Sequence, residues 1–181
     1  HGGLVGVAVA IVLFARNRGR AVFAVSDMIA CAAPIGLFFG RIANFINNEL
    51  WGRPSDLPWA MTFPIPDHLE TYFPEVPRHP SQLYEAALEG AVLFALLYIL
   101  RRDQRIAARP GMLTGIFLAG YGIARFVVEF VREPDVQIGL IGGVVTMGQL
   151  LSIPMVLVGV AIAQWAARQT TAETPANRHA G

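Results

Sequence analysis

Apolar stretches alternate with polar connections along the whole of this 181-residue chain. A helix needs about 20 apolar residues to cross the hydrocarbon core of a bilayer, and fewer where flanking arginines reach toward the interface. The stretches that meet or approach this length are residues 4–15, 21–39, 82–100, 112–131 and 147–167. The pattern predicts an all-α, polytopic membrane protein with five transmembrane helices within these residues.

The polar connections differ greatly in length. The longest, residues 41–79, is rich in proline and contains Trp51 and Trp59, aromatic residues that favour the membrane–water interface. We expect residues 1–167 to form a single transmembrane domain that includes this connection. We expect residues 168–181 to form a disordered cytoplasmic tail.

Basic residues are concentrated in two short connections, residues 16–20 and 101–109, and every basic residue of the chain is an arginine. In a five-helix arrangement these connections fall on the same side. Arginine in short loops marks the cytoplasmic side of a membrane protein. The connections 41–79 and 132–145 are therefore expected to face outward.

Composition narrows the class of protein. The chain is 54% hydrophobic and 15% charged, with a mean hydropathy of +0.49, which is too apolar for an ordinary soluble domain. A formal net charge of +1 argues against a nucleic-acid partner. Cys31 is the only cysteine and lies in an apolar stretch, so an intrachain disulfide is excluded and a packed thiol is expected.

A dense polar patch follows the second apolar stretch and includes Arg41, Asn44, Asn47 and Glu49. Charged and amide groups near hydrocarbon are costly, and they usually line a cavity or touch a polar ligand. The planar guanidinium of Arg41 suits a phosphate, and asparagine amides suit hydroxyl or ester oxygens. The alternative on chemistry alone is a solvated interfacial loop with one arginine that extends to the interface.

A second polar group lies in the fourth apolar stretch. Tyr121, Arg125 and Glu129 are four residues apart, so they form one stripe along a helix. Ionisable residues in a membrane are functional candidates, whereas the structural alternative is an internal Arg125–Glu129 ion pair. For Glu85 and Glu89, one turn apart in the third stretch, the structural interpretation is at least as strong, and Glu85 is the better site candidate.

Several patches together have the pattern of one family. They are His1-Gly2-Gly3, Gly40-Arg41-x-x-Asn44-Phe45-x-Asn47-x-Glu49-x-x-Gly52-Arg53, Arg78-His79-Pro80-Ser81-Gln82-Leu83-Tyr84-Glu85, Tyr121-Gly122-x-x-Arg125 with Glu129, and Met147-Gly148-Gln149-x-Leu151-Ser152. The chain thereby resembles the bacterial prolipoprotein diacylglyceryl transferases over nearly its whole length up to the tail. It departs from the family pattern at Ala43 and Asn48, where the family commonly has glycine.

The resemblance implies a reaction at the bacterial inner membrane, with the active site toward the outer leaflet. A family member transfers the sn-1,2-diacylglyceryl group of phosphatidylglycerol to the lipobox cysteine thiol of a prolipoprotein peptide, which forms a thioether and releases glycerol phosphate. This is the first step of bacterial lipoprotein maturation, it takes place in the lipid bilayer, and it needs no cofactor or metal. Because the chain begins inside a family patch, the complete protein is expected to have about two further helices upstream and about seven in all.

The resemblance also implies roles for individual residues. The catalytic candidates are His1, Arg41, Tyr121 and Arg125, and the substrate-binding candidates are Arg41, Asn44, Asn47, Glu49, Gly52 and Glu129. The imidazole of His1, with an ordinary pKa of about 6.5, suits the acceptance of a thiol proton near neutral pH. Arg41 and Arg125 would hold the phosphate, and Asn44 and Tyr121 would orient the head group. No metal is expected, since His68 and His79 are too far apart in sequence for a typical zinc-ligand pair.

Two other classes of function were weighed. A lipid or solute transporter would use the polar stripe as a translocation path, but the sequence has no internal repeat of the kind that many transporters show. A purely structural membrane scaffold would not need the dense polar patch that follows Gly40. The sequence therefore favours the transferase.

The arginine distribution predicts that Ser55 and Gln104 lie on opposite sides of the membrane. In the complete protein carrying Cys31→Ser, the single variants Ser55→Cys and Gln104→Cys should react from opposite sides of intact membranes. An impermeant thiol reagent measures this. Reaction of both cysteines from the outside would show that the five-span arrangement is wrong.

Overall fold

The fold is mainly helical, as the sequence predicts. The computed structural model describes residues 2–65, 73–133, 140–141 and 145–169. Its helices are α1 (Gly2–Asn17), α2 (Val22–Ile46), α3 (Ser81–Glu85), the π-helix η2 (Ala86–Val92), α4 (Leu93–Arg102), α5 (Gln104–Ala107), α6 (Met112–Val128) and α7 (Met147–Arg168). A short antiparallel pair, β1 (Leu140–Ile141) and β2 (Val145–Thr146), precedes α7.

Each predicted apolar stretch coincides with a helix. Among the described residues, three helical runs are long and apolar enough to cross a membrane: α2, the continuous run Ser81–Arg102 and α7. The first and fourth stretches correspond to the shorter apolar helices Val5–Asn17 and α6. The count of five spans therefore stays a prediction.

The end of α2 differs from the prediction. The helix continues to Ile46, beyond the end predicted at residue 39, so Arg41 and Asn44 lie on a helix and not in the connection. A helix end predicted from hydropathy falls where the apolar stretch meets a charged residue. The helix itself can continue where a neighbouring helix supplies a partner for that charge. Asn48 and Leu50, with φ of 55° and 58°, then turn the chain away. Asparagine tolerates this left-handed region better than most residues other than glycine, so Asn48 suits this turn.

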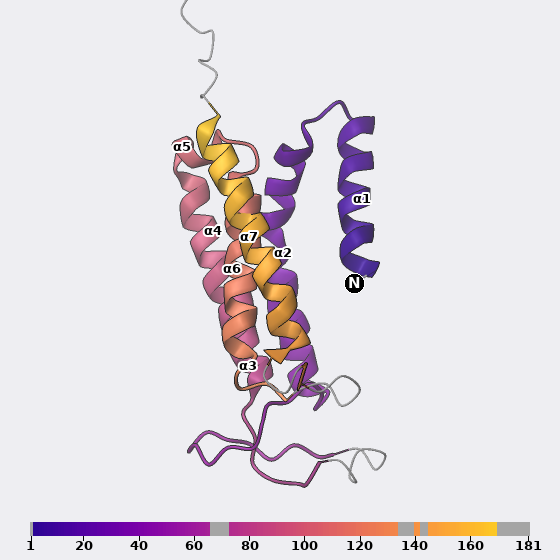
Figure 1. The fold of residues 1–181 in the computed structure, drawn as a ribbon, viewed down its shortest axis with the longest axis vertical. Coiled ribbons are helices and arrows are strands. Elements are labelled where there is room, and N and C mark those ends of the chain that lie inside the picture. Colours follow the sequence, from indigo (N-terminus) through magenta and orange to yellow (C-terminus); the bar gives the residue numbers. More distant parts are fainter. Residues whose placement is uncertain (1, 66–72, 134–139, 142–144, 170–181) are drawn as a thin grey trace, which may run out of the picture.

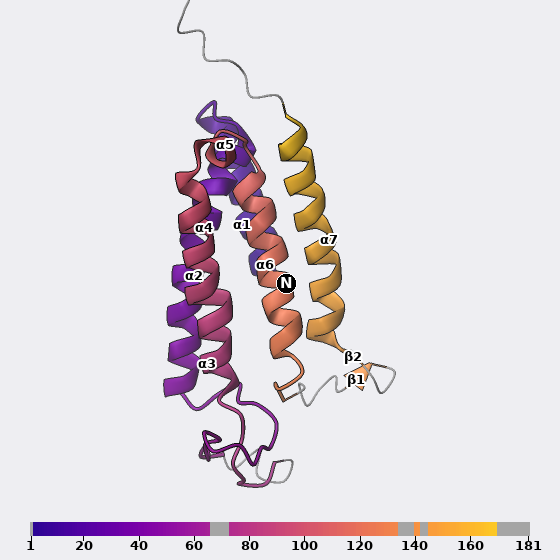
Figure 2. The same cartoon turned by 90° about the vertical axis from the view of Figure 1, so that its left-hand side faces the viewer.

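Helices α2, α4, α6 and α7 lie side by side, and α1 flanks α2 (Figure 1). The arginine-rich connections 16–20 and 101–109 lie at one end of the bundle, together with the C-terminal end of α7. The described part of the long connection forms a layer at the opposite end (Figure 2). The two arginine-rich connections thus share one end, as predicted.

Asp27 explains the carboxylate that interrupts the second apolar stretch. It accepts hydrogen bonds from the backbone N–H of Gly111 at 2.8 Å and of Thr114 at 2.7 Å. These are N–H groups of the first turn of α6, which have no partner within the helix and favour a negative charge. Asp27 therefore caps α6 from α2 and fixes the position of α6, the helix that carries Tyr121 and Arg125.

Glycines let α6 and α7 approach very closely. A Cβ added at Gly115 would lie 2.6 Å from the carbonyl oxygen of Gly159, and a Cβ added at Gly159 would lie 2.5 Å from the backbone nitrogen of Ala119. Small residues at such crossings bring helix backbones together in membranes.

At the start of α7, Thr146 and Gln149 form a reciprocal capping box.

The crossing of α6 and α7 predicts that Gly159→Ala destabilises the protein. The added methyl group would meet backbone atoms that cannot move aside, and overpacking of this kind costs about 1–3 kcal/mol. Gly36→Ala is the matched control, because a Cβ at Gly36 meets nothing within 4 Å. Thermal unfolding in detergent should separate the two variants, and equal midpoints would contradict this account of the crossing.

Candidate active site

Charged side chains from three helices and the turn after α6 meet near the end of the bundle that carries the long connection. We call this group the ion cluster; its members are Arg41, Glu85, Glu89, Arg125, Glu129 and Arg132. Three guanidinium groups face three carboxylates, so the cluster is formally neutral. Neutrality matters here because an unpaired buried charge is severely destabilising.

Glu85 lies at the centre of the ion cluster and is fully buried. Its Oε2 is 2.8 Å from Nε of Arg41, and its Oε1 is 2.9 Å from Nη1 of Arg125. A guanidinium nitrogen of Arg132 lies 3.8 Å from the same Oε1. One carboxylate from α3 thus joins the two arginines that the sequence singled out, from α2 and α6.

Glu89 holds Arg41 from the other side. Nε and Nη2 of Arg41 donate to Glu89 Oε2 at 3.2 and 3.0 Å. Glu89 belongs to the π-helix η2, a form that occurs frequently at functional sites. The second oxygen, Oε1 of Glu89, is buried and has no hydrogen-bond partner among the residues that the structure describes.

Glu129 forms an ion pair with Arg125. Its Oε2 is 3.0 Å from Arg125 Nη2, so the ion pair of the structural alternative is present. A Cβ on Gly148 would lie 2.5 Å from the Glu129 carboxyl carbon. Gly148, from the last family patch, therefore leaves room for the carboxylate that holds Arg125.

Each central arginine has five N–H donors. The contacts with the glutamates involve Nε and Nη2 of Arg41 and Nη1 and Nη2 of Arg125. Both guanidinium groups are only 15% exposed, so a ligand would meet them largely shielded from water. Rigidly held donors in such a site stabilise developing negative charge more effectively than donors in water.

The other predicted site residues lie at different depths. Tyr121 is half-buried on α6, one turn before Arg125, with its ring 6.1 Å from that of Phe117. Asn44 is half-buried one turn after Arg41, whereas Asn47 and Glu49 are exposed. His1 lies outside the described residues, and so does His68.

Gly52 is buried at a crossing of backbone segments. Its N–H donates to the carbonyl of His79 at 2.9 Å, and an added Cβ would lie 2.6 Å from the His79 Cβ. It also pairs with Arg132 in an antiparallel bridge. Close packing explains why a glycine is needed at position 52. The contact of Gly52 with substrate stays a prediction.

The long connection is tied to the bundle by buried polar groups. Gln82 donates to the Glu49 carbonyl at 2.7 Å, and Ser81 donates to the Leu50 carbonyl at 3.0 Å. Arg78 is buried and pairs with Glu133 at 2.8 Å. The end of α2 and the start of α3 are thereby held together beside the ion cluster.

Sequence reasoning missed two contributors to this site, Arg132 and Gly148. Arg132 follows the end of α6, so no helical spacing connects it with Glu85. Gly148 has a visible signal in its family patch, but its role depends on Glu129 in another segment. Within the described ranges, no group of three or more histidine, cysteine, aspartate or glutamate side chains is arranged to hold a metal ion.

Comparison with known proteins finds relatives that match nearly the whole chain. The chain is 58% identical to the phosphatidylglycerol–prolipoprotein diacylglyceryl transferase of Paramagnetospirillum magneticum, over 93% of this chain and 61% of that protein. It is 54% identical to the protein of the same name from Rhodospirillum rubrum, over 98% of this chain and 63% of that protein. The chain is 52% identical to the protein of the same name from Vibrio atlanticus, over 92% of this chain and 57% of that protein.

The chain therefore spans about three fifths of the length of the curated relatives that it matches. The family model for prolipoprotein diacylglyceryl transferase matches residues 1–165, which include every described member of the ion cluster. With this match and these identities, the chain belongs to the prolipoprotein diacylglyceryl transferase family.

Proposed function

We propose that this chain forms the larger part of an enzyme that transfers the sn-1,2-diacylglyceryl group of phosphatidylglycerol to the lipobox cysteine of a prolipoprotein. The observation that carries the proposal is the Glu85 carboxylate, which joins Arg41 and Arg125 from different helices. The names of the relatives support both substrates. The transporter alternative is not favoured by the family match.

In the proposed reaction, the cysteine thiolate attacks the sn-3 carbon of the diacylglyceryl group, which bears the phosphate. A carbon–sulfur bond forms, the carbon–oxygen bond to phosphate breaks, and glycerol phosphate leaves with the electron pair. Arg41 and Arg125 bind the phosphate through their guanidinium N–H groups, while Glu85, Glu89 and Glu129 hold the two side chains in place. These donors stabilise the negative charge that grows on the leaving group.

Glu89 has a proposed role in head-group recognition. Its Oε1 is buried with no hydrogen-bond partner in the described part of the chain, and leaving such an acceptor unpaired is costly. The head group of phosphatidylglycerol carries glycerol hydroxyls, which are donors. A hydroxyl that donates to Glu89 while the phosphate meets Arg41 would favour glycerol over head groups that carry no hydrogen-bond donor.

The thiol proton is assigned to His1. A thiol with a pKa of about 8.5 must lose its proton to become a nucleophile, and a neutral imidazole can accept it. Asn44 and Tyr121 are assigned to orienting the lipid, with Asn47, Glu49, Gly52 and Glu129 as further binding residues. The ion cluster faces the outer leaflet in this proposal, because the arginine-rich connections lie at the opposite end of the bundle.

The direct test uses the complete protein in phosphatidylglycerol vesicles with a lipobox peptide. Mass spectrometry should detect a peptide heavier by one diacylglyceryl group, and a peptide with Cys→Ser in the lipobox is the control. A peptide of unchanged mass, with a folded protein, would refute the proposed function.

Arg41→Lys tests whether the guanidinium shape is needed or only its charge. Lysine keeps the charge but cannot contact Glu85, Glu89 and a phosphate from fixed directions. Loss of one preorganised donor typically costs about 100- to 1000-fold in rate, so turnover should fall at least about 100-fold at saturating lipid. Arg101→Lys, at an exposed arginine near the opposite end, is the matched control. Near-normal turnover of a stable Arg41→Lys protein would exclude this role.

Glu85→Gln tests whether the ion cluster acts as one unit. The amide keeps the shape but removes the charge shared by Arg41 and Arg125. We expect a loss of turnover similar to that of Arg41→Lys, and a double variant that is no worse than the poorer single variant, since residues that act together are not additive. Turnover of all three purified variants measures this. Independent, multiplying losses would contradict a shared unit.

A further inference from the structure

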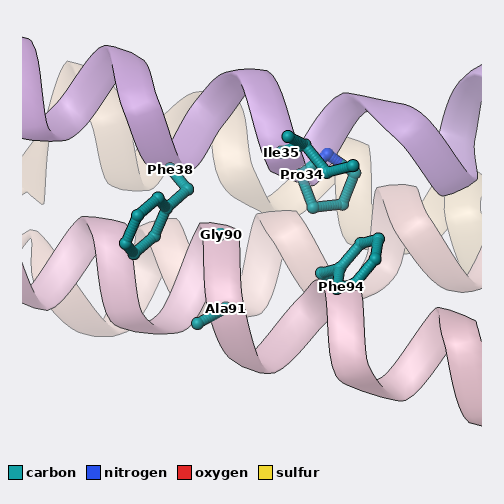
Figure 3. Close-up of a pocket in the computed structure, with 6 residues that line it drawn as sticks. All are labelled: Pro34, Ile35, Phe38, Gly90, Ala91 and Phe94. Carbon is teal, nitrogen blue, oxygen red and sulfur yellow. The ribbon is translucent and has the colours of Figure 1, made fainter.

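An apolar groove runs along the outside of the bundle between α2 and the η2–α4 segment. It is lined by Pro34, Ile35, Phe38, Gly90, Ala91 and Phe94 and has a volume of about 140 Å³. Phe38 and Phe94 stand toward its two ends, with Gly90 and Ala91 between them (Figure 3). No charged or hydrogen-bonding side chain contributes to its lining.

The groove lies close to the ion cluster along the same two segments. Its α2 wall ends at Phe38, one helical turn before Arg41, and its other wall contains Gly90, the residue after Glu89. Arg41 and Glu89 are joined at 3.0 Å. From there the groove leads toward Pro34, about 10 Å deeper along α2 at 1.5 Å per residue. It therefore extends from the polar cluster toward the middle of the bundle.

We propose that this groove binds an acyl chain of the phosphatidylglycerol molecule whose phosphate is held at Arg41. The proposal rests on the proposed function and adds to it the place where the lipid's apolar part is recognised. An apolar cavity of about 150 Å³ holds a molecule of the size of benzene, so the groove fits a short section of one hydrocarbon chain.

The shape of the groove depends on Gly90. A Cβ at Gly90 would lie 2.7 Å from the Phe38 Cβ and 2.9 Å from its Cα, so glycine alone allows this approach of the two helices. The bottom of the groove is then formed by small residues, and Ala91 at its surface is exposed. Ala91 is therefore the position at which a larger side chain would fill the groove and leave the Arg41–Glu89 pair in place.

The test is photocrosslinking of the complete protein with phosphatidylglycerol that carries a diazirine on one acyl chain. Peptide mass mapping should find adducts in residues 34–38 and 90–94. Ala91→Phe should lower their yield at least about 10-fold, which corresponds to about 1.4 kcal/mol. Ile35→Trp fills the groove from the other wall and should act alike, which keeps the test valid if one variant unfolds. Ala95→Phe, at an exposed alanine outside the groove, is the matched control.

A parallel experiment with phosphatidylcholine that carries the same diazirine tests whether the acyl chain in the groove comes from phosphatidylglycerol or from any bilayer lipid. Equal adducts from both lipids would show only surrounding bilayer lipid, and adducts that Ala91→Phe and Ile35→Trp leave unchanged would place the chain elsewhere; either result overturns the proposal. The transfer assay on the same preparation separates the two hypotheses. Transfer without groove adducts overturns the groove alone. Head-group-selective adducts without transfer overturn the proposed function and support the groove as a phosphatidylglycerol site.

Discussion

The described site depends on the two ion pairs that the Glu85 carboxylate forms with Arg41 and Arg125. The Glu85 side chain is buried at the meeting point of α2, α3 and α6, and it pairs with Arg41 and Arg125 at 2.8 and 2.9 Å. Without Glu85, Arg41 would keep Glu89 and Arg125 would keep Glu129, but no carboxylate would join the two arginines. By holding both, Glu85 fixes their distance and direction before any ligand arrives, which is the condition for preorganised electrostatic stabilisation.

Several features of the fold serve this arrangement. Asp27 caps α6 from α2 and sets the position of Arg125, and Gly148 leaves room for Glu129 beside it. Gly52 lets the long connection lie against the start of α3, beside the cluster. These residues need not touch a substrate, and their types follow from close packing or from unpaired backbone groups.

In the proposed function, the ion cluster and the apolar groove divide recognition between the two parts of a phospholipid. The cluster offers guanidinium donors and the Oε1 atom of Glu89, which has no hydrogen-bond partner among the described residues; these groups suit a phosphate and a hydroxyl. The groove between Phe38 and Phe94 offers only apolar surface. The groove and the Arg41–Glu89 pair of the cluster lie on the same two neighbouring segments, α2 and η2–α4, so a single lipid can meet both.

The sequence by itself determined the helical class, the approximate positions of the apolar helices and the family. It also singled out Arg41, Tyr121, Arg125 and Glu129, because polar and charged residues in or next to an apolar stretch are visible in one dimension. The positions of the two arginine-rich connections at one end of the bundle follow from the alternation of helices, which is likewise a property of the sequence.

The tertiary structure decided which charges meet. Hydropathy could not show that α2 continues through Arg41, because that continuation depends on Glu85 and Glu89 of another helix. The role of Glu85 as the shared partner, and the presence of Arg132 beside it, likewise depend on segments that are distant in sequence. A sequence records each charge separately, whereas its partner is set by helix packing, and in an apolar bundle the partner decides what a buried charge can do.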